Sequence, residues 1–68
     1  MKLVDIGKVV RVSERWTKKG VFYLLVVEGV NSAWKVFVKD AIEEGERVAV
    51  FEKGDKMYVK RLEAVLSD

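Results

Sequence analysis

The segment W-K-V-F-V-K-D, residues 34–40, holds the side chains of this sequence that are best suited to chemistry with a ligand. In a β-strand, alternate side chains point to opposite faces, so Trp34 and every second residue after it would share one face. Lys35, Phe37 and Lys39 would share the other face. Two ammonium groups on either side of an exposed aromatic ring can stack a nucleobase and neutralise the phosphates beside it.

The usual residues of catalysis and metal binding are scarce. The chain has no cysteine and no histidine, which removes thiolate and imidazole groups as nucleophiles, bases and ligands. Asp40, Glu43, Glu44 and Glu46 lie close together, but capping of a helical turn and solvation account for them. They lack the spacing of an EF-hand loop. We therefore expect a protein that is not an enzyme and that binds neither a metal nor a cofactor.

Five strand-like runs, separated by turn residues, must position the segment at 34–40. Gly7 predicts a bulge or bend near the start of the first run. Residues 40–45 predict one helical turn, with Asp40 as N-cap, Glu43 in a capping box and Gly45 at the C′ position. Residues 63–68 form a short tail, expected to pack back on the strands. The five runs cover residues 6–15, 21–27, 33–39, 47–52 and 57–62.

Length and composition limit the class of protein. The 68 residues make one domain, 1–68, with no room for a second core. The net charge of +2 is too small to prove a polyanionic partner, so the placement of the charges decides. The longest apolar run, 21–27, is far shorter than the roughly 20 residues of a membrane helix. Since the first residues also lack the pattern of a secretory signal, we expect a soluble, cytoplasmic protein with no membrane association. Abundant lysine and glutamate are typical of thermophilic proteins.

Four stretches of the chain resemble the OB-fold family. They are I-G-K-V-V-R-V from Ile6, G-V-F-Y-L-L-V-V-E-G from Gly20, W-K-V-F-V from Trp34, and I-E-E-G-E-R-V-A-V-F-E-K-G-D-K-M-Y-V from Ile42. Within that family the chain is most similar to the compact single-stranded DNA-binding domains of archaeal replication protein A type. The resemblance implies an all-β, five-stranded antiparallel Greek-key barrel with one helical turn between strands 3 and 4. It also implies non-catalytic binding of single-stranded nucleic acid, with DNA favoured over RNA.

The OB-fold family binds its ligands on the outer face of strands 2 and 3 and on the loops between strands 1 and 2 and strands 4 and 5. We expect Phe22, Leu24 and Val26 to point inward, which leaves Tyr23 outward beside Phe37. The loops add cations and one aromatic residue, and Arg11 and Arg15 are expected nearby on the first strand. The predicted nucleic-acid-binding residues are Trp16, Lys18, Lys19, Tyr23, Lys35, Phe37, Lys39 and Lys53.

Four aromatic residues have a structural interpretation to set beside ligand binding. Trp16 could equally be a hydrophobic plug over the open end of a barrel. Phe51 and Tyr58 have the phase of core residues on the fourth and fifth runs. A slip of one residue would bury Phe37 and expose Val36, so the surface prediction depends on register. The predicted core comprises Ile6, Val10, Val12, Phe22, Leu24, Val26, Trp34, Val36, Val38, Val48, Val50, Val59 and Leu62.

Two other functions stay open. An outward surface of Tyr23, Leu25, Val27 and Phe37 would also suit a homodimer or a protein partner. Barrels that bind small anions have a similar length and a similar Gly-Glu-x-Val sequence, here 45–48, but this chain lacks the Ser-Arg-Asn opening of that family. Ionic strength distinguishes nucleic-acid binding from an apolar protein contact, because a nucleic-acid complex weakens steeply with salt and an apolar contact does not.

Overall fold

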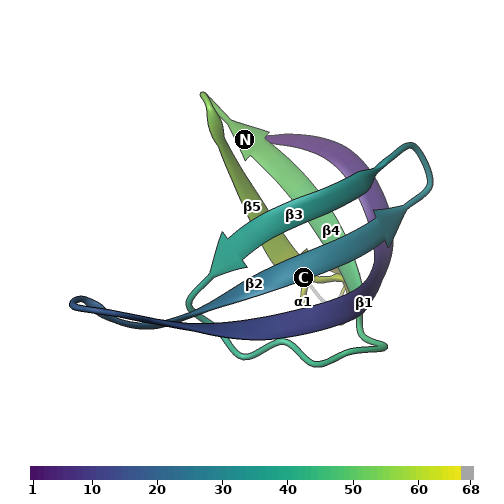
Figure 1. Ribbon diagram of the computed structural model, residues 1–68. Helices are drawn as coiled ribbons and strands as arrows, with labels where there is room; N and C mark the ends of the chain where they lie inside the picture. The colour runs from purple at the N-terminus through teal and green to yellow at the C-terminus, as the bar shows by residue number, and fades with distance from the viewer. Residues whose placement is uncertain (67–68) are drawn as a thin grey trace.

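The computed structural model describes residues 1–66 and contains five β-strands and one short helix (Figure 1). Neighbouring strands pair antiparallel in the order β3-β2-β1-β4-β5. The expectation of a nearly all-β chain with five antiparallel strands is confirmed. The elements are β1 (Lys2–Thr17), β2 (Gly20–Gly29), β3 (Ala33–Val38), β4 (Arg47–Lys53), β5 (Lys56–Arg61) and α1 (Leu62–Leu66).

Strand β1 organises the sheet because it pairs with two strands in succession. Its residues 2–8 pair with β4, and its residues 7–17 pair with β2. The strand curves strongly between these two halves (Figure 1). Register shifts at residues 3–5 and 9–11 add the irregularities that such curvature requires. Gly7, predicted as a bulge or bend, lies where the two halves of β1 meet and so fits the predicted bend, but it forms no bulge: it pairs regularly with Gly29, where a Cβ would collide with the backbone of Glu28.

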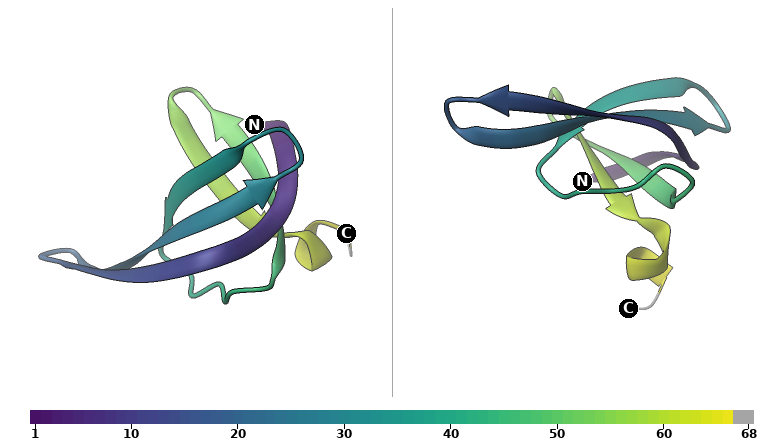
Figure 2. Two further views of the ribbon diagram at one scale, coloured as in Figure 1. Left: turned by 45° about the vertical axis from the view of Figure 1, so that its right-hand side comes forward. Right: turned by 60° about the horizontal axis from the view of Figure 1, so that its bottom comes forward.

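The curvature brings the two edges of the sheet together. Strands β3 and β5 lie side by side (Figures 1 and 2) and contact each other, although no β-ladder joins them. The core fills the space inside the curled sheet. Its buried centre consists of Val9, Leu25, Val27, Ile42, Val48 and Val50, with Val4, Val12, Tyr23, Trp34, Val38, Met57 and Val59 packed around it.

The core prediction was wrong on β1 and β2. Ile6 and Val10 are exposed. The bulge at 9–11 lets both Val9 and Val12 face inward, which a strict two-residue period forbids. On β2 the inward set is Tyr23, Leu25 and Val27, the reverse of the predicted phase. The predicted phase of β3 is confirmed, because Val36 is buried and Phe37 is exposed.

The segment between β3 and β4 forms no helical turn, so the prediction for 40–45 was wrong. Tertiary contacts hold it as an extended connection that ends in a turn. Ile42 is buried in the core, and the Gly45 N–H donates to the Val9 carbonyl at 2.8 Å. The short helix follows β5 instead, where α1 packs against β4 and β5. The last part of the predicted tail, 67–68, lies outside the described residues.

A buried carboxylate fixes the turn between β2 and β3. Asp5 is only 5% exposed, and its two oxygens accept the backbone N–H groups of residues 30–32 at 3.0–3.2 Å. They also accept the Trp34 Nε1–H at 2.7 Å and the Ile6 N–H at 2.8 Å. The Trp34 hydrogen bond, followed by the backbone donors, lowers the pKa of Asp5 from 3.8 to about 2 despite its burial. This clamp anchors the start of β3, the strand that bears Phe37.

Candidate functional site

The outer face of β1, β2 and β3 displays cations around an apolar centre. Cross-strand pairing defines its rows: Arg11, Val26 and Lys35 form one, and Ser13, Leu24 and Phe37 form the next. Arg15 pairs with Phe22 in a third row, which Lys39 completes just beyond β3. We call this surface the β2–β3 face. Its residues are Arg11, Ser13, Arg15, Phe22, Leu24, Val26, Lys35, Phe37 and Lys39.

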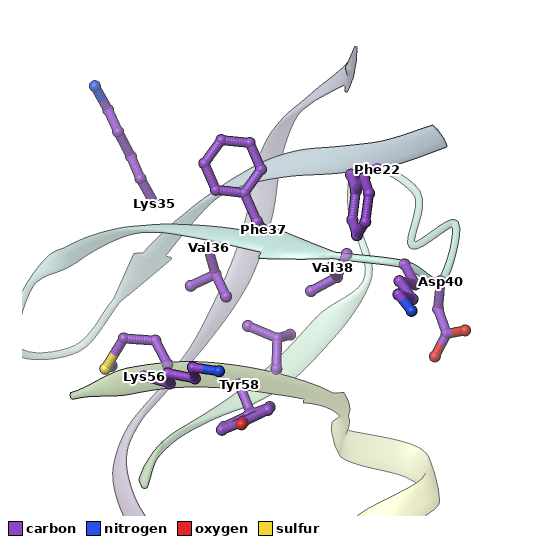
Figure 3. A pocket seen from close by; sticks show the side chains of 11 residues that line it. Phe22, Lys35, Val36, Phe37, Val38, Asp40, Lys56 and Tyr58 are labelled. Carbon is purple, nitrogen blue, oxygen red and sulfur yellow. The ribbon is translucent and has the colours of Figure 1, made fainter. Parts of the chain in front are cut away.

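Phe37 is the most accessible ring of this face. Its side chain is 63% exposed and stands on the outer side of β3, beside Lys35 (Figure 3). Its cross-strand neighbour, Leu24, supports it from β2. The Nζ of Lys39 lies 5.8 Å from the centroid of the Phe22 ring, within the range of a cation–π contact. Two phenyl rings and two lysines therefore occupy one end of the face.

Tyr23 does not belong to this face, so its predicted outward position was wrong. It is partly buried and packs against the core cluster, on the same side as Leu25 and Val27. Those two residues are 0% exposed. The three β2 residues that the sequence suggested for an apolar partner contact are therefore not available, and the outward apolar residues of β2 are instead Phe22, Leu24 and Val26. Phe22, predicted as core, takes the outward place that was expected of Tyr23.

The connection between β1 and β2 is a projecting hairpin that extends beyond the end of β3 (Figures 1 and 2). Lys18 and Lys19 form its two-residue turn and are exposed. The hydroxyl of Thr17 accepts the Lys19 N–H at 3.1 Å and donates to the Gly20 carbonyl at 2.9 Å. Trp16 is 77% exposed on this hairpin, which excludes its interpretation as a hydrophobic plug. Its pairing with Val21 puts it on the opposite face from Phe22.

A groove of about 670 Å³ separates β3 from β5 and borders the β2–β3 face. Val36 and Val38 point into the space between the two strands, whereas Phe37 stands on one rim and Tyr58 on the other (Figure 3). Lys35, Lys39 and Lys56 also line it, with a single carboxylate, Asp40, at one end. The groove is thus apolar within and mainly cationic around its margin.

Lys53 lies apart from the other predicted binding residues. It ends β4 and pairs with Lys56 of β5, which places it across the groove from Phe37. The structure therefore brings Lys35, Phe37 and Lys39 together and leaves Lys53 on the far side. Sequence reasoning expected Arg11 and Arg15 near this surface but missed Phe22. A two-residue turn at 18–19 would have paired Arg15 with Phe22 and revealed that Phe22 points outward.

Within residues 1–66, no carboxylate forms a salt bridge with a cation of the β2–β3 face. Among residues 1–66, the one salt bridge joins Arg61 to Glu46 at 2.7 Å, at the opposite end of the sheet from the hairpin. There the Glu43 N–H, followed by Arg61, lowers the pKa of Glu46, and Glu46 in turn raises the pKa of Arg61. Arg61 also donates to the Ala41 carbonyl at 2.8 Å, which ties the β3–β4 connection to β5. The Arg61–Glu46 pair therefore has a structural role, and the cations around Phe37 remain accessible to an anion.

Within the described part of the chain, no three acidic, histidine or cysteine side chains come close enough to hold a metal ion. No helix there has the length and apolar character needed to cross a membrane. No protein-family model, no curated protein and no solved structure matches this chain. The geometry of the β2–β3 face is therefore the basis for a proposal of function.

Proposed function

We propose that this protein is an OB-fold domain that binds single-stranded nucleic acid without catalysis, with DNA favoured over RNA. The observation that supports this most is Phe37, 63% exposed between Lys35 and Lys39 on a strand whose other side is core. Exposing an apolar ring on a small domain forgoes the stability of burying it, so a ligand is the natural reason for it. Flanking cations specify an anionic ligand with planar groups.

The order of the strands supports the proposal that the domain has an OB-fold. An OB-fold is a five-stranded, partly open Greek-key barrel that presents strands 2 and 3 to its ligand. The order β3-β2-β1-β4-β5, with β3 and β5 in contact across a groove, fits a barrel that stays open at this one seam. The chain differs from the usual member in having no helix between β3 and β4.

Binding would combine base stacking with phosphate neutralisation. Phe37 offers a free ring face, and Phe22 offers a second once Lys39 moves from it to a phosphate. Arg11, Arg15, Lys35 and Lys39 lie along both sides of the rings, and Lys18 and Lys19 extend the positive track along the hairpin. The three rows of the β2–β3 face would hold about four to six nucleotides, within the range that one OB-fold covers.

Titration with oligo-dT of about five nucleotides tests the proposal. Phe37→Ala should weaken binding by about 1–3 kcal/mol, because one stacked base is lost. The melting temperature should hardly change, since this ring contributes little to the core. Val30→Ala is the matched control: Val30 is 87% exposed on the β2–β3 turn, and its loss should not affect affinity.

Measurements at several salt concentrations and with duplex DNA could contradict the proposed function. If three to five phosphates are neutralised, log K should fall with log salt with a slope of about −2 to −3.5. Equal affinity for duplex of the same length would indicate a non-specific cationic protein. No binding at low salt, together with a dimer by light scattering, would favour a protein-interaction barrel. Competition by inorganic phosphate or another small oxyanion alone would favour the anion-binding alternative.

A further inference from the structure

A second cationic surface lies on the outer side of β4 and β5. The core cluster takes Val48 and Val50 from β4, so the alternate residues of that strand and their cross-strand partners point outward. Glu52, the one carboxylate of these two strands, falls on the opposite phase, where it is exposed near the end of β4. We call the outward set the β4–β5 face. It consists of Arg47, Phe51, Lys53, Lys56, Tyr58 and Lys60; Ala49 has the same phase but is buried, at 1% exposure.

Phe51 and Tyr58 form the aromatic centre of the β4–β5 face. The two residues are directly opposite each other on β4 and β5, and Tyr58 is 38% exposed. The Nζ of Lys60 lies 5.7 Å from the Phe51 centroid, much as Lys39 lies 5.8 Å from Phe22 on the β2–β3 face. Both outer faces thus combine a ring covered by a lysine with a more accessible ring. The sequence had given Phe51 and Tyr58 the phase of core residues; Val48, Val50 and Val59 take the inward phase instead, so both rings lie on the outer side, Phe51 partly buried there.

The groove between β3 and β5 connects the two faces. Phe37 borders it from the β2–β3 face and Tyr58 borders it from the β4–β5 face (Figure 3). Between them lie the valine side chains of both edge strands and Met57. A flexible chain that leaves Phe37 and crosses the groove would therefore meet Tyr58 next, with Lys56 beside it.

We propose that the β4–β5 face is a second binding segment for the same single strand of nucleic acid, with Tyr58 as its stacking residue and Lys56 and Lys60 as its phosphate contacts. The inference rests on the proposed function and extends it to a longer ligand. Charge complementarity selects this occupant: the face carries four cations and no carboxylate. A second copy of the chain is disfavoured, because a two-fold contact would set these like charges against themselves.

Oligomer length provides the test. Oligo-dT of about five nucleotides fills only the β2–β3 face, whereas about twelve nucleotides, still within the range for one OB-fold, can cover both faces. Tyr58→Ala should weaken binding of the longer oligomer about fivefold or more and change that of the shorter one less than about twofold. Lys60→Gln should reduce the steepness of the salt dependence for the longer oligomer by about 0.7.

Phe37→Ala and Val30→Ala complete the design. Phe37→Ala should weaken both oligomers, and Val30→Ala should weaken neither. If wild-type protein binds neither oligomer, the proposed function itself fails. If both oligomers bind and Tyr58→Ala affects them equally or not at all, the second segment is refuted while the first stands. Loss of a protein dimer in Tyr58→Ala, with unchanged affinity for both oligomers, would assign the face to self-association. Melting curves of each variant exclude a general loss of folding.

Discussion

The two ends of β2 are held in opposite ways, and a tryptophan marks each. At the end near Gly29, Trp34 is partly buried and its Nε1–H donates to the buried carboxylate of Asp5 at 2.7 Å. At the start, near Gly20, Trp16 is 77% exposed on a hairpin whose turn is held by local hydrogen bonds of Thr17. One end is fixed to the core, and the other projects into solvent.

Under the proposed function, this difference would place the structural role at one end of β2 and ligand binding at the other. The turn at 30–32 has each of its backbone N–H groups bound to Asp5, so it has little freedom to adapt to a ligand. The hairpin tip at 18–19 has no such tether and carries two lysines. Loops that bind ligands are commonly drawn from the less stable parts of a fold. We therefore expect substitutions at the fixed end to change stability and those at the hairpin to change binding.

Asp5→Asn should have the largest effect on stability. The amide has one oxygen in place of two, so at least two of the five N–H donors around it would face an NH₂ group. We expect a melting temperature lower by about 10 °C or more. The matched control is Asp55→Asn in the exposed β4–β5 turn, which should melt like the wild type.

The stabilisation by Asp5 should also depend on pH in a defined window. Its folded pKa, about 2, lies below the ordinary value of 3.8. A lowered folded pKa means that the contribution is complete above about pH 4 and is lost as the pH falls toward 2. Denaturant unfolding at a series of pH values should show this loss in the wild type. A similar loss in Asp5→Asn between pH 4 and 2 would place its origin in another group.

Trp34→Phe should have the second largest effect on stability, because it removes one hydrogen-bond donor to Asp5 and leaves the carboxylate in place. The Trp34 hydrogen bond is the largest cause of the lowered pKa, so the pKa of Asp5 should rise from about 2 toward 3.8. Titration of the Asp5 side-chain carbon by NMR measures this directly. Trp16→Phe is the control at the other end of β2 and should leave the pKa of Asp5 unchanged. An unchanged pKa in Trp34→Phe would mean that the backbone donors alone hold the carboxylate ionised.

The sequence predicts which side chains of a strand point outward only where polar residues alternate with apolar ones. In the run at 33–39, lysines alternate with apolar residues, and the prediction that Lys35, Phe37 and Lys39 share the outer face was therefore correct. The run at 21–27 is apolar on both faces, and alternation could not choose between Tyr23 and Phe22. Only the pairing with β1 resolves it: Tyr23 lies opposite Glu14, which has the phase of the inward Val12, whereas Phe22 lies opposite Arg15.

Other errors arose where distant contacts outweighed local signals. Asp40, Glu43 and Gly45 are good capping residues, yet burial of Ile42 and the hydrogen bond from Gly45 to Val9 hold the segment extended. A bulge at 9–11 exposed Val10 because one extra residue reverses the phase, and no glycine marks it. These features depend on how β1 is shared between two neighbours, which no local pattern encodes.

Trp16→Ala should have the smallest effect on stability. A ring that is 77% exposed loses little apolar contact when removed, so the free energy of unfolding should change by less than about 0.5 kcal/mol. If the hairpin folds over a bound strand, the same substitution should weaken oligo-dT binding by about 1–3 kcal/mol, the value of one stacked base. Trp34 then remains as an internal probe, and its emission should not respond to the ligand, because its indole N–H is already bound to Asp5. Unchanged affinity in Trp16→Ala would limit the binding surface to the β-sheet and leave the hairpin with its lysines alone.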